Sequence, residues 1–470
     1  MTITERRAPA ASLDAPELVE RLRATFATGR TKPLAWRKQQ LAGLRRMMEE
    51  GEDELLEGLK LDLGRPRVEA FAADIGHTKA ELRHLYRHVG EWMKPKRVKV
   101  PMAAAPAKAY VHNEPLGVAL VIAPWNYPIQ LLVEPIGAAI AAGNCVVGKP
   151  SELAPACSAA LARLLPRYVD SEAVVIVEGA VDETTALLAQ RWDHIFFTGS
   201  TAVGRVVAEA AAKHLTPTTL ELGGKSPTYV HASANLDVAA RRIAWGKFLN
   251  AGQTCIAPDY VLVDREIRDQ LVDRLTAQIG EFYGSDAQQS SSYGRIVNER
   301  HVDRLSRILV DGIGTVVTGG RVDKADRFIE PTVSVDPHPD SVVMNEEIFG
   351  PILPVLTVDG PAQAAAFITA RPKPLALYVF AEDDHQVDSI VEQTSSGGVC
   401  VNQTLMHLLP PELPFGGVGD SGMGAYHGKS GYDAFSHQKS VLNKPTRPDL
   451  KLLYPPYRKL SEWIVRKVVR

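Results

Sequence analysis

The sequence predicts an α/β protein built on a parallel, doubly wound sheet. From Gly117 onward, short apolar segments of strand length are repeatedly followed by a turn and a segment with helical spacing. At 470 residues the chain is also too long for one ordinary hydrophobic core, so two large domains are expected. Alternating strands and helices place ligands at the carboxyl ends of the strands.

Composition excludes several classes of protein. The formal net charge is −2, and there is no basic bias of the kind that nucleic-acid binding requires. The four cysteines are far apart and have no paired spacing, so we expect neither a disulfide framework nor a metal site, but reduced thiols in the cytoplasm. They are Cys145, Cys157, Cys255 and Cys400.

Neither a secretory signal nor a membrane span is expected. Met1–Pro16 carries charges and has no apolar core of a signal peptide. Leu116–Val133 is long and uncharged enough to suggest a span, but Pro124, Asn126 and Pro128 lie in its middle. This segment is better interpreted as a buried strand that enters a turn.

The N-terminal quarter is predicted to be helical. Pro16–Leu59 and Ala70–Met93 have apolar residues at helical spacing, separated by charged side chains. Val98–Tyr110 differs, because two prolines flank a stretch of small residues. Since Tyr110–His112 resembles a strand, this segment is predicted to be an arm that leaves the domain.

The alternating region begins after that arm. Ser151 is expected to cap the helix that extends through Leu165. The segments predicted here are strands at Val118–Ala123, Asn144–Gly148, Ala173–Val177 and His194–Phe197, and a helix at Gln130–Ala142.

A second alternating α/β region follows Cys255. Its predicted segments are Val261–Val263, a helix at Glu266–Ile279, an apolar segment at Leu305–Leu309, and later strands at Leu353–Leu356, Leu377–Phe380 and Gly398–Asn402. The tail from Lys444 to Arg470 is basic. Its last part places Leu460, Trp463, Ile464 and Val468 on one helical face.

Two residues suggest covalent chemistry. Cys255 lies between a threonine and a turn of small residues, and Glu221 leads into Gly223 and Gly224, which permit a sharp bend. A thiol that forms a covalent intermediate needs a base to hydrolyse it, and the pair supplies both. Taken alone, Cys255 would more often be a small buried apolar residue and Glu221 a surface carboxylate.

Several short motifs occur in a fixed order along the chain. They are residues 124–128 (PWNYP), 149–152 (KPSE), 197–204 (FTGSTAVG), 221–225 (ELGGK), 252–255 (GQTC), 345–351 (NEEIFGP) and 414–419 (PFGGVG). With these motifs, the chain resembles the aldehyde dehydrogenase superfamily over roughly residues 15–445. Residues 256–260 (IAPDY) and 421–428 (SGMGAYHG) are similar to its class 3 branch.

The resemblance implies a reaction and three catalytic residues. The Cys255 thiolate would attack an aldehyde carbon, and the thiohemiacetal would become a thioester by passing hydride to a nicotinamide. Asn126 and the Cys255 N–H would hold the oxyanion, a contribution of about 3–4 kcal/mol per donor. Glu221 would activate the water that hydrolyses the thioester. Without this context, Asn126 would be interpreted as the cap of a turn.

The resemblance also implies a cofactor site. A glutamate beside the adenosine ribose disfavours a 2′-phosphate, so NAD is the first choice, with NADP accepted in addition. The Gly199 turn departs from the standard G-x-G-x-x-G spacing, so by itself it is a weak phosphate signal. The expected cofactor residues are Lys149 and Glu152 at the ribose, Gly199, Ser200 and Gly204 at the pyrophosphate, and Glu347 and Phe349 at the nicotinamide riboside.

Three residues are expected at the substrate pocket. Tyr127 and Trp245 match positions that line the aldehyde pocket of class 3 relatives, although aromatic residues are more often plain core. Glu134, where relatives carry glutamine, would change substrate preference if it faced the tunnel. Gly148, where leucine is common, is expected to loosen the wall beside Lys149.

The expected architecture is a Rossmann-type cofactor domain, an α/β catalytic domain and a small β arm that bridges two subunits of a homodimer. The boundaries are residues 12–94 and 116–221 for the cofactor domain, 222–424 for the catalytic domain, 95–115 and 425–446 for the arm, and 447–470 for the basic tail. The tail would be a surface helix, a dimer contact or a membrane-surface helix. Its apolar face is too short to span a bilayer.

Three alternatives stay open at this stage. A CoA-acylating dehydrogenase would use a thiol to resolve the thioester, and would not need Glu221. A binding protein could keep the fold without the reaction, although Cys255, Asn126 and Glu221 are all present. A thiol esterase would need no cofactor, which leaves the ribose and nicotinamide residues unexplained.

Overall fold

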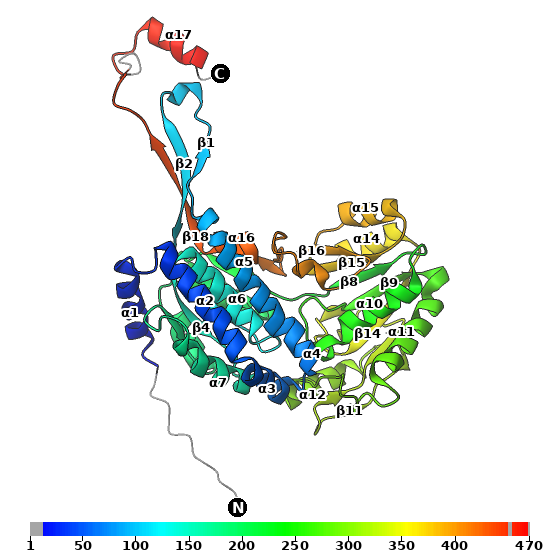
Figure 1. Ribbon diagram of the computed structural model, residues 1–470. Helices are drawn as coiled ribbons and strands as arrows, with labels where there is room; N and C mark the ends of the chain where they lie inside the picture. Colours follow the sequence, from blue (N-terminus) through cyan, green and yellow to red (C-terminus); the bar gives the residue numbers. More distant parts are fainter. Residues whose placement is uncertain (1–12, 450–453, 469–470) are drawn as a thin grey trace, which may run out of the picture.

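A computed structural model describes residues 13–449 and 454–468 of the chain. Two lobes lie side by side, and a narrow arm rises from the first of them (Figure 1). The expectation for Met1–Pro16 and the predicted domain start at residue 12 lie largely outside the described residues, as do residues 450–453 and 469–470 of the tail.

The first lobe contains a sheet with the strand order β17-β7-β6-β3-β4-β5, parallel except for β17. Its strands are β3 (Val118–Ile122), β4 (Cys145–Lys149), β5 (Val174–Ile176), β6 (His194–Thr198), β7 (Thr218–Glu221) and β17 (Gly422–Met423). The central strands β3, β4 and β6 are buried at every residue, because helices cover both faces. The predicted strands correspond to β3, β4, β5 and β6.

The register of this sheet brings site residues to one edge. Ile122 pairs with Lys149 on one side and with Phe197 on the other, and Thr198 pairs with Glu221. The carboxyl ends of β3, β4, β6 and β7 therefore meet at the same edge, which is where doubly wound sheets bind ligands.

The central helix of this lobe is α6, which packs against α2, α5 and α16, is buried at all of its residues and is apolar on nearly all sides. α6 is Gln130–Ala142 as predicted, and Gly143 ends it in the left-handed conformation. The others are α1 (Ala15–Ala27), α2 (Leu34–Glu50), α3 (Glu52–Leu63), α4 (Arg67–Ala70), the π-helix η1 (Phe71–Gly76), α5 (His77–Trp92), α7 (Pro155–Leu164), η3 (Leu165–Arg167), α8 (Val181–Leu188), α9 (Thr201–Ala212) and α16 (Gly428–Ala434).

The predicted capping role of Ser151 is wrong. α7 begins later, at Pro155, and its N-cap is Ala154, which makes no side-chain cap. The Ser151 hydroxyl instead accepts a hydrogen bond from the backbone N–H of Leu153 at 3.2 Å. Pro155 sets the start of the helix, because its fixed φ favours the first helical position.

The second lobe contains a sheet with the strand order β10-β13-β14-β9-β8-β15-β16, parallel except at β10. Its strands are β8 (Pro227–Val230), β9 (Tyr260–Asp264), β10 (Thr315–Thr318), β13 (Thr332–Val335), β14 (Ile352–Val358), β15 (Ala376–Phe380) and β16 (Gly398–Val401), with a separate pair β11 (Val322–Asp323) and β12 (Phe328–Ile329).

The helices of the second lobe are α10 (Leu236–Phe248), η4 (Leu249–Gly252), η5 (Arg265–Ile267), α11 (Arg268–Tyr283), α12 (Glu299–Ile308), α13 (Val342–Asn345), α14 (Pro361–Thr369), α15 (Asp384–Gln393) and η6 (Met406–Leu408). The apolar segment predicted at Leu305–Leu309 is the end of α12. Its buried residues Val302, Leu305 and Ile308 follow the spacing of a helix. A segment that begins at Leu305 is too short to show this helical spacing.

The arm is a separate sheet of β1 (Lys96–Val98), β2 (Lys108–Pro115) and β18 (Ser436–Asn443), with β2 in the middle. η2 (Met102–Ala104) lies at its tip next to α17 (Lys459–Val468) (Figure 1). Leu460 and Trp463 of α17 are exposed. In the described ranges, no helix is long and apolar enough to cross a membrane.

Sheet membership differs from the expected boundaries near the end of the chain. β17 pairs with β7 of the first lobe, whereas residues 222–424 were expected in the catalytic domain. α16 packs against α5 and α6, although residues 425–446 were expected in the arm. The chain thus returns to the first lobe before it enters β18, a path that no local pattern indicates.

Candidate active site

Cys255 follows a loop with an unusual backbone. Asn250, Ala251 and Gly252 have positive φ values of 52°, 51° and 76°. Glycine is required at the last of these, because a Cβ there would lie 2.2 Å from the Gly350 carbonyl oxygen. Such a run costs free energy and persists only when the surroundings fix it, which is common at active sites.

Gln253 fixes this loop. Its side-chain oxygen accepts from the Val297 N–H at 2.9 Å, and its amide nitrogen donates to the carbonyl oxygens of Asn250 and Arg295, each at 2.9 Å. The Gln253 side chain is fully buried. Cys255 is therefore presented on a rigid loop, partly exposed to a cavity.

Burial governs the protonation of Cys255. It raises the pKa of the thiol to about 12, and the nearby carboxylates Glu347 and Glu221 add to the rise. Backbone N–H groups of Cys255 and Ile256 act in the opposite direction. In the protein alone the thiol is thus held protonated, with two acidic groups near enough to affect its charge.

Asn126 lies in the turn after β3, next to the cysteine loop. Its Nδ2 donates to the carbonyl oxygen of Gln253 at 3.1 Å, and its Oδ1 has no hydrogen-bond partner among the described residues. The Asn126 carbonyl oxygen accepts from Asn250 Nδ2 at 2.9 Å. The structure therefore brings Asn126 and the cysteine loop together through two direct hydrogen bonds.

Arg65 connects these groups to the first lobe. It is fully buried, and its guanidinium donates to the Asn126 carbonyl oxygen, to Asn250 Oδ1 and to the Asp74 carboxylate. Its guanidinium carbon also lies 4.6 Å from the centre of the Tyr127 ring. A buried arginine needs partners for all its donors, and here these partners hold the asparagine turn against the cysteine loop.

Asp74 completes this network. Besides pairing with Arg65, its carboxylate accepts from the N–H groups of Ile129 and Gln130, which open α6, at 3.2 Å and 2.9 Å. Arg65, Asp74 and Asn250 were missed from the sequence. Isolated polar and charged residues are usually on the surface, so nothing local distinguishes these.

Glu221 ends β7 inside the protein. Both of its carboxylate oxygens are buried and have no hydrogen-bond partner within residues 13–449 and 454–468. Burial raises the pKa of Glu221 well above its usual value. An unpaired buried carboxylate costs folding free energy, and it is therefore typical of a functional group that binds a ligand or water.

Glu347 approaches the backbone just after Glu221. A Cβ at Gly223 would lie 2.1 Å from Glu347 Oε2, so only glycine leaves space for the carboxylate. Burial raises the pKa of Glu347 to about 8, Asp259 adds to this, and a hydrogen bond from the Gly224 N–H opposes it. Its Oε1 is buried without a partner among the described residues.

Phe349 stands next to Glu347 in a left-handed conformation, with φ of 46°. Its ring packs edge-on against Trp125 at 5.3 Å, and Trp125 also contacts the His301 ring at 5.1 Å. These rings form an aromatic group close to the carboxylate. His301 was not predicted, because it lies on α12, far away in the sequence.

Lys149 ends β4 at the edge of the first sheet. It is buried, its Nζ donates to the Pro150 carbonyl oxygen at 2.7 Å, and Glu152 lies 3.9 Å away. Burial lowers the pKa of Lys149, while Glu152 opposes that change. The two side chains therefore lie together, with Glu152 the more exposed.

The expectation that Gly148 loosens the wall beside Lys149 is wrong. A Cβ at this position would lie 2.8 Å from Ile136 Cδ1 and 2.9 Å from Ile176 Cδ1. The space that a leucine would occupy is already filled by these isoleucines, so the wall is closed.

Gly199, Ser200 and Gly204 lie between β6 and α9. Gly199 donates its N–H to the Glu221 carbonyl oxygen at 3.0 Å, and Ser200 caps α9 through the Val203 N–H. Gly204 lets α9 pack closely on the sheet, because a Cβ there would lie 2.6 Å from Leu222 Cδ2. This arrangement leaves the N-terminus of α9 at the sheet edge, where an anion is stabilised.

The cavity in front of Cys255 has a volume of about 620 Å³, which is suited to a small organic molecule. Tyr127 and Trp245, which were predicted to contact the substrate, both line this cavity. The Tyr127 hydroxyl forms a hydrogen bond with Thr254 Oγ1 at 2.6 Å. Most of the wall is apolar, with aromatic side chains from both lobes. Its other large apolar residues include Leu131, Leu249, Ile256, Phe282, Tyr283, Leu405, Met406, Leu408, Phe415 and Tyr426.

Glu134 does not line this cavity. It is buried in α6, behind His77 and His427, and these two histidines do line the wall. The condition under which Glu134 would meet a substrate directly is therefore not fulfilled in the structure.

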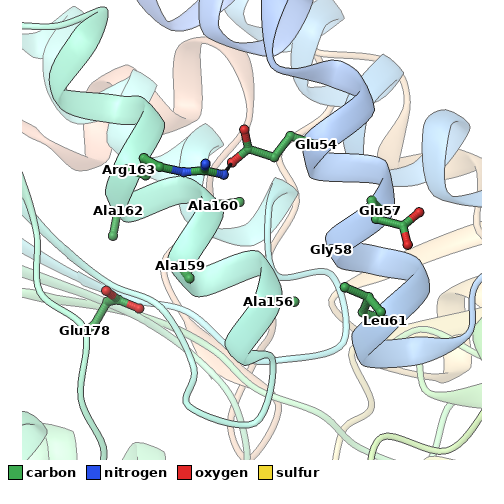
Figure 2. A pocket seen from close by; sticks show the side chains of 10 residues that line it. All are labelled: Glu54, Glu57, Gly58, Leu61, Ala156, Ala159, Ala160, Ala162, Arg163 and Glu178. Carbon is green, nitrogen blue, oxygen red and sulfur yellow. Dashed lines mark hydrogen bonds and ion pairs between the residues drawn. The ribbon is translucent and has the colours of Figure 1, made fainter. Parts of the chain in front are cut away.

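A second hollow, of about 680 Å³, lies between α3 and α7. Figure 2 shows Ala156 and Ala160 on the side of α7 toward α3, with Arg163 reaching across to Glu54. Its lining includes no cysteine, serine, threonine or histidine. Within the described chain, no cluster of three or more histidine, cysteine or acidic residues is arranged to hold a metal ion.

Comparisons with known proteins show which family the chain is similar to. The sequence model described as the aldehyde dehydrogenase family matches residues 3–441. The chain is 47% identical over 442 residues to a protein named aldehyde dehydrogenase, dimeric NADP-preferring, from Canis lupus familiaris, covering 94% of this chain and 97% of the relative. It is 46% identical to a 4,4'-diaponeurosporen-aldehyde dehydrogenase from Staphylococcus aureus, covering 94% and 96%.

The fold is similar to that of a solved structure described as a substrate-bound state of Staphylococcus aureus AldH. The TM-score is 0.94 at 45% sequence identity, and the match covers 96% of this chain and 99% of that chain.

Proposed function

The chain belongs to the aldehyde dehydrogenase family and catalyses NAD(P)-dependent aldehyde oxidation, and we propose that Cys255, Glu221 and Asn126 carry out this reaction on medium-chain aliphatic or aromatic aldehydes. The observation that supports this most is the pairing of a cavity-facing thiol with a buried carboxylate that has no partner in the described chain. A thiol and a base are the two groups that the chemistry needs.

Cys255 forms the bond to the aldehyde carbon, and the thiol proton must leave as the bond forms. Since burial and the two carboxylates hold the pKa of the thiol at about 12, the proton needs an acceptor nearby. Glu221 and Glu347 both contribute to that pKa and are the candidate acceptors in the site. Asn126 Nδ2 and the Cys255 N–H then stabilise the oxyanion.

Glu221 activates the water that hydrolyses the thioester. Its raised pKa makes the carboxylate a stronger base than an ordinary glutamate, which suits it to accept a proton from the attacking water. The alternative of a CoA-acylating dehydrogenase leaves this buried residue without a role. A thiol esterase would leave the buried Lys149 and the orphaned Glu347 oxygen unexplained.

The residues around the sheet edge fit a nicotinamide dinucleotide. Such a group would supply the hydride acceptor that oxidation of the thiohemiacetal requires. Lys149 and Glu152 would hold the adenosine ribose hydroxyls, the N-terminus of α9 with Gly199, Ser200 and Gly204 the pyrophosphate, and Glu347 with Phe349 the nicotinamide riboside. The unpaired Glu347 Oε1 supports the last assignment, because it needs a donor such as a ribose hydroxyl.

NAD is proposed as the preferred cofactor, with NADP accepted as well. The Glu152 carboxylate beside Lys149 would repel a 2′-phosphate. The name of the Canis lupus familiaris relative states a preference for NADP. The proposed preference for NAD would therefore distinguish this chain from that relative.

The substrate class rests on the cavity. Its wall of aromatic and aliphatic side chains favours an apolar chain or ring, and Tyr127 and Trp245 are proposed to pack against it. Its volume suits a medium-chain molecule better than a very small one.

We also propose a cytoplasmic homodimer. The four free cysteines suit a reducing compartment. The arm of β1, β2 and β18 stands apart from the body (Figure 1), and strands that protrude in this way are suited to pairing with a second copy.

The test is NADH and NADPH formation with a panel of aliphatic and aromatic aldehydes, on wild type and Cys255→Ala. Turnover by wild type with medium-chain and aromatic aldehydes and none by the variant supports the proposal. Equal turnover by Cys255→Ala would refute the role of the thiol. A CoA-dependent rate would support the acylating alternative.

A further inference from the structure

A buried carboxylate lies between two histidines of the cavity wall. Glu134 of α6 accepts a hydrogen bond at Oε1 from His77 Nδ1 at 2.7 Å, and His427 Nε2 lies 3.5 Å from Oε2. Thr78 Oγ1 also donates to Oε1, at 3.3 Å, and Gln130 Nε2 lies 3.5 Å from Oε2. The catalytic residues proposed above do not account for this cluster.

The charges in this cluster follow from its geometry. Burial alone would raise the pKa of Glu134, but the charge and hydrogen bond of His77 bring it below its usual value. Burial lowers and Glu134 more strongly raises the pKa of His77, to about 8. Burial lowers the pKa of His427 to about 4. At neutral pH, His77 and Glu134 thus form an ion pair and His427 is neutral.

One more acidic group faces this pair. Glu81 lies one turn along α5 from His77, and its carboxylate accepts from the Gly428 N–H at 2.7 Å. Burial raises the pKa of Glu81 to about 7, so near neutral pH it is only partly charged. The remaining neighbours, Thr78 and Gln130, are neutral.

The ring of His77 has one nitrogen to spare. Nδ1 is used by Glu134, whereas His77 itself lines the cavity with its side chain 10% exposed. The Leu408 carbonyl oxygen on the same wall helps to raise the pKa of His77, but among the described residues the ring nitrogen that bonds it at normal hydrogen-bond geometry is His427 Nδ1, at 3.2 Å. Nε2–H is therefore a charged donor available at a wall that is otherwise largely apolar.

We propose that His77 determines substrate specificity, by donating from Nε2 to an oxygen acceptor on the part of the aldehyde remote from the reacting carbon. This inference rests on the proposed function, because it concerns the same cavity. The favoured substrates are aldehydes with an ether, hydroxyl or carbonyl oxygen beyond the aldehyde group. A plain alkyl chain in that place would leave Nε2–H with no better acceptor than the poorly aligned Leu408 carbonyl oxygen, which costs affinity.

Cationic aldehydes are the disfavoured class. A carboxylate exposed to the cavity would attract them, but Glu134 is covered by His77 and His427, and Glu69, which lines the wall, is paired with Arg65 at 3.6 Å. A cationic substrate therefore meets the positive edge of His77 first, and like charges repel.

Glu134 is a positioning residue in this scheme. Its hydrogen bond fixes which nitrogen of His77 faces the cavity, as second partners of histidine commonly do. Its charge also keeps His77 protonated near pH 7. Glutamine at this position preserves the hydrogen-bond acceptor but removes the charge, so the two contributions can be separated.

The experiment compares four aldehydes of equal length, ending in methyl, methoxy, hydroxyl or trimethylammonium, over a series of chain lengths. The measured quantity is the ratio of kcat/KM values within each variant. For wild type at pH 7, we expect the best methoxy aldehyde to exceed its methyl analogue by about tenfold, as one hydrogen bond to a charged donor provides. The trimethylammonium aldehyde should be the poorest substrate.

The variants are His77→Leu, Glu134→Gln and, as a control, His385→Leu, which removes an exposed histidine at the start of α15. His77→Leu should bring the methoxy-to-methyl ratio to about one, and His385→Leu should keep the wild-type ratio. If His77→Leu alone does not fold because Glu134 is left unpaired, the double variant His77→Leu/Glu134→Gln removes that charge.

The pH profile tests the protonation of His77. A methoxy oxygen only accepts, so the wild-type preference for it should disappear as pH rises through about 8, whereas a hydroxyl can donate to neutral Nε2 and should keep its preference. In Glu134→Gln, this midpoint should move to lower pH. A merely structural role of Glu134 would not move it.

Equal ratios for methoxy and methyl aldehydes in wild type, or a preference that survives in His77→Leu, would overturn the inference and leave the proposed function intact. If no aldehyde were oxidised, the proposed function would fail instead. Calorimetric binding of the matching methoxy and methyl primary alcohols to Cys255→Ala would then still decide whether His77 recognises the oxygen.

Discussion

The approach of Glu347 to Gly223 makes a sharp prediction for Gly223→Ala. The new Cβ would lie 2.1 Å and 2.4 Å from the two carboxylate oxygens, whereas Cβ atoms in real proteins keep at least 3.0 Å. The carboxylate must therefore move by about 0.9 Å, the difference between 3.0 Å and 2.1 Å. A displacement of about 1 Å in a site of this kind reduces catalysis by roughly 100-fold, or about 2.7 kcal/mol.

The fold should tolerate this change. Gly223 is not among the residues with positive φ, so the backbone accepts alanine, and the clash involves the end of a side chain rather than the main chain. We expect kcat/KM for NAD to fall by about 100-fold while the free energy of unfolding changes by less than about 1 kcal/mol. Steady-state kinetics and urea denaturation measure the two quantities.

A double-mutant cycle isolates the mechanism. In a Glu347→Ala background there is no carboxylate to displace, so Gly223→Ala should lower kcat/KM by less than about threefold there. An equal loss in both backgrounds would show that Gly223→Ala acts through the backbone, and would refute the steric argument.

Three further predictions follow from the site and its walls. Glu221→Gln should still acylate, because Glu347 remains to accept the thiol proton, but it should hydrolyse slowly. The expected result is a burst of about one NADH per active site before a steady rate that is lower by about 10²-fold or more; a steady rate equal to wild type would contradict the role of Glu221. The rate at which iodoacetamide alkylates Cys255 should rise about tenfold per pH unit between pH 7 and pH 10. The reason is that the fraction of thiolate rises about tenfold per pH unit at pH values below a pKa of about 12. A plateau below pH 9, measured against Cys255→Ser as the unreactive control, would show that the thiol is not held protonated. Gly148→Leu should lower the free energy of unfolding by about 1–3 kcal/mol, because the new side chain overlaps Ile136 and Ile176; unchanged stability in urea denaturation would mean that these isoleucines yield.

The elements that the sequence predicted well are those with a strong local signal. α6 has the predicted bounds, because an apolar run of helical length ends at Gly143, which adopts the left-handed conformation. The strands β3 and β4 were visible as continuous apolar runs, since a parallel strand covered on both faces needs no polar alternation.

The predictions that failed depend on neighbours that are distant in the sequence. Gly148 was expected to leave a gap, but Ile136 and Ile176 fill it, and neither could be placed there by spacing alone. Glu134 was recognised as unusual, but its position behind His77 and His427 depends on how α5, α6 and the segment before α16 meet.

The site itself was only partly visible in the sequence. Motifs brought Cys255, Glu221 and Asn126 to notice because similar proteins share them. The structure adds the electrostatics, since the unpaired oxygens of Glu221 are a property of burial among distant segments.

Arg65 has a mechanical consequence for the whole molecule. Arg65 belongs to the first lobe, and its guanidinium donates hydrogen bonds to Asn250 of the second lobe and to the Asn126 carbonyl oxygen. Separating the lobes at this point would remove a partner from the buried Arg65 charge and break its hydrogen bond to Asn250, and the loss of a partner from a buried charge typically costs about 3–5 kcal/mol. Any hinge motion that admits a dinucleotide should therefore pivot around Arg65, so that the cleft opens elsewhere while thiol and amide keep their alignment.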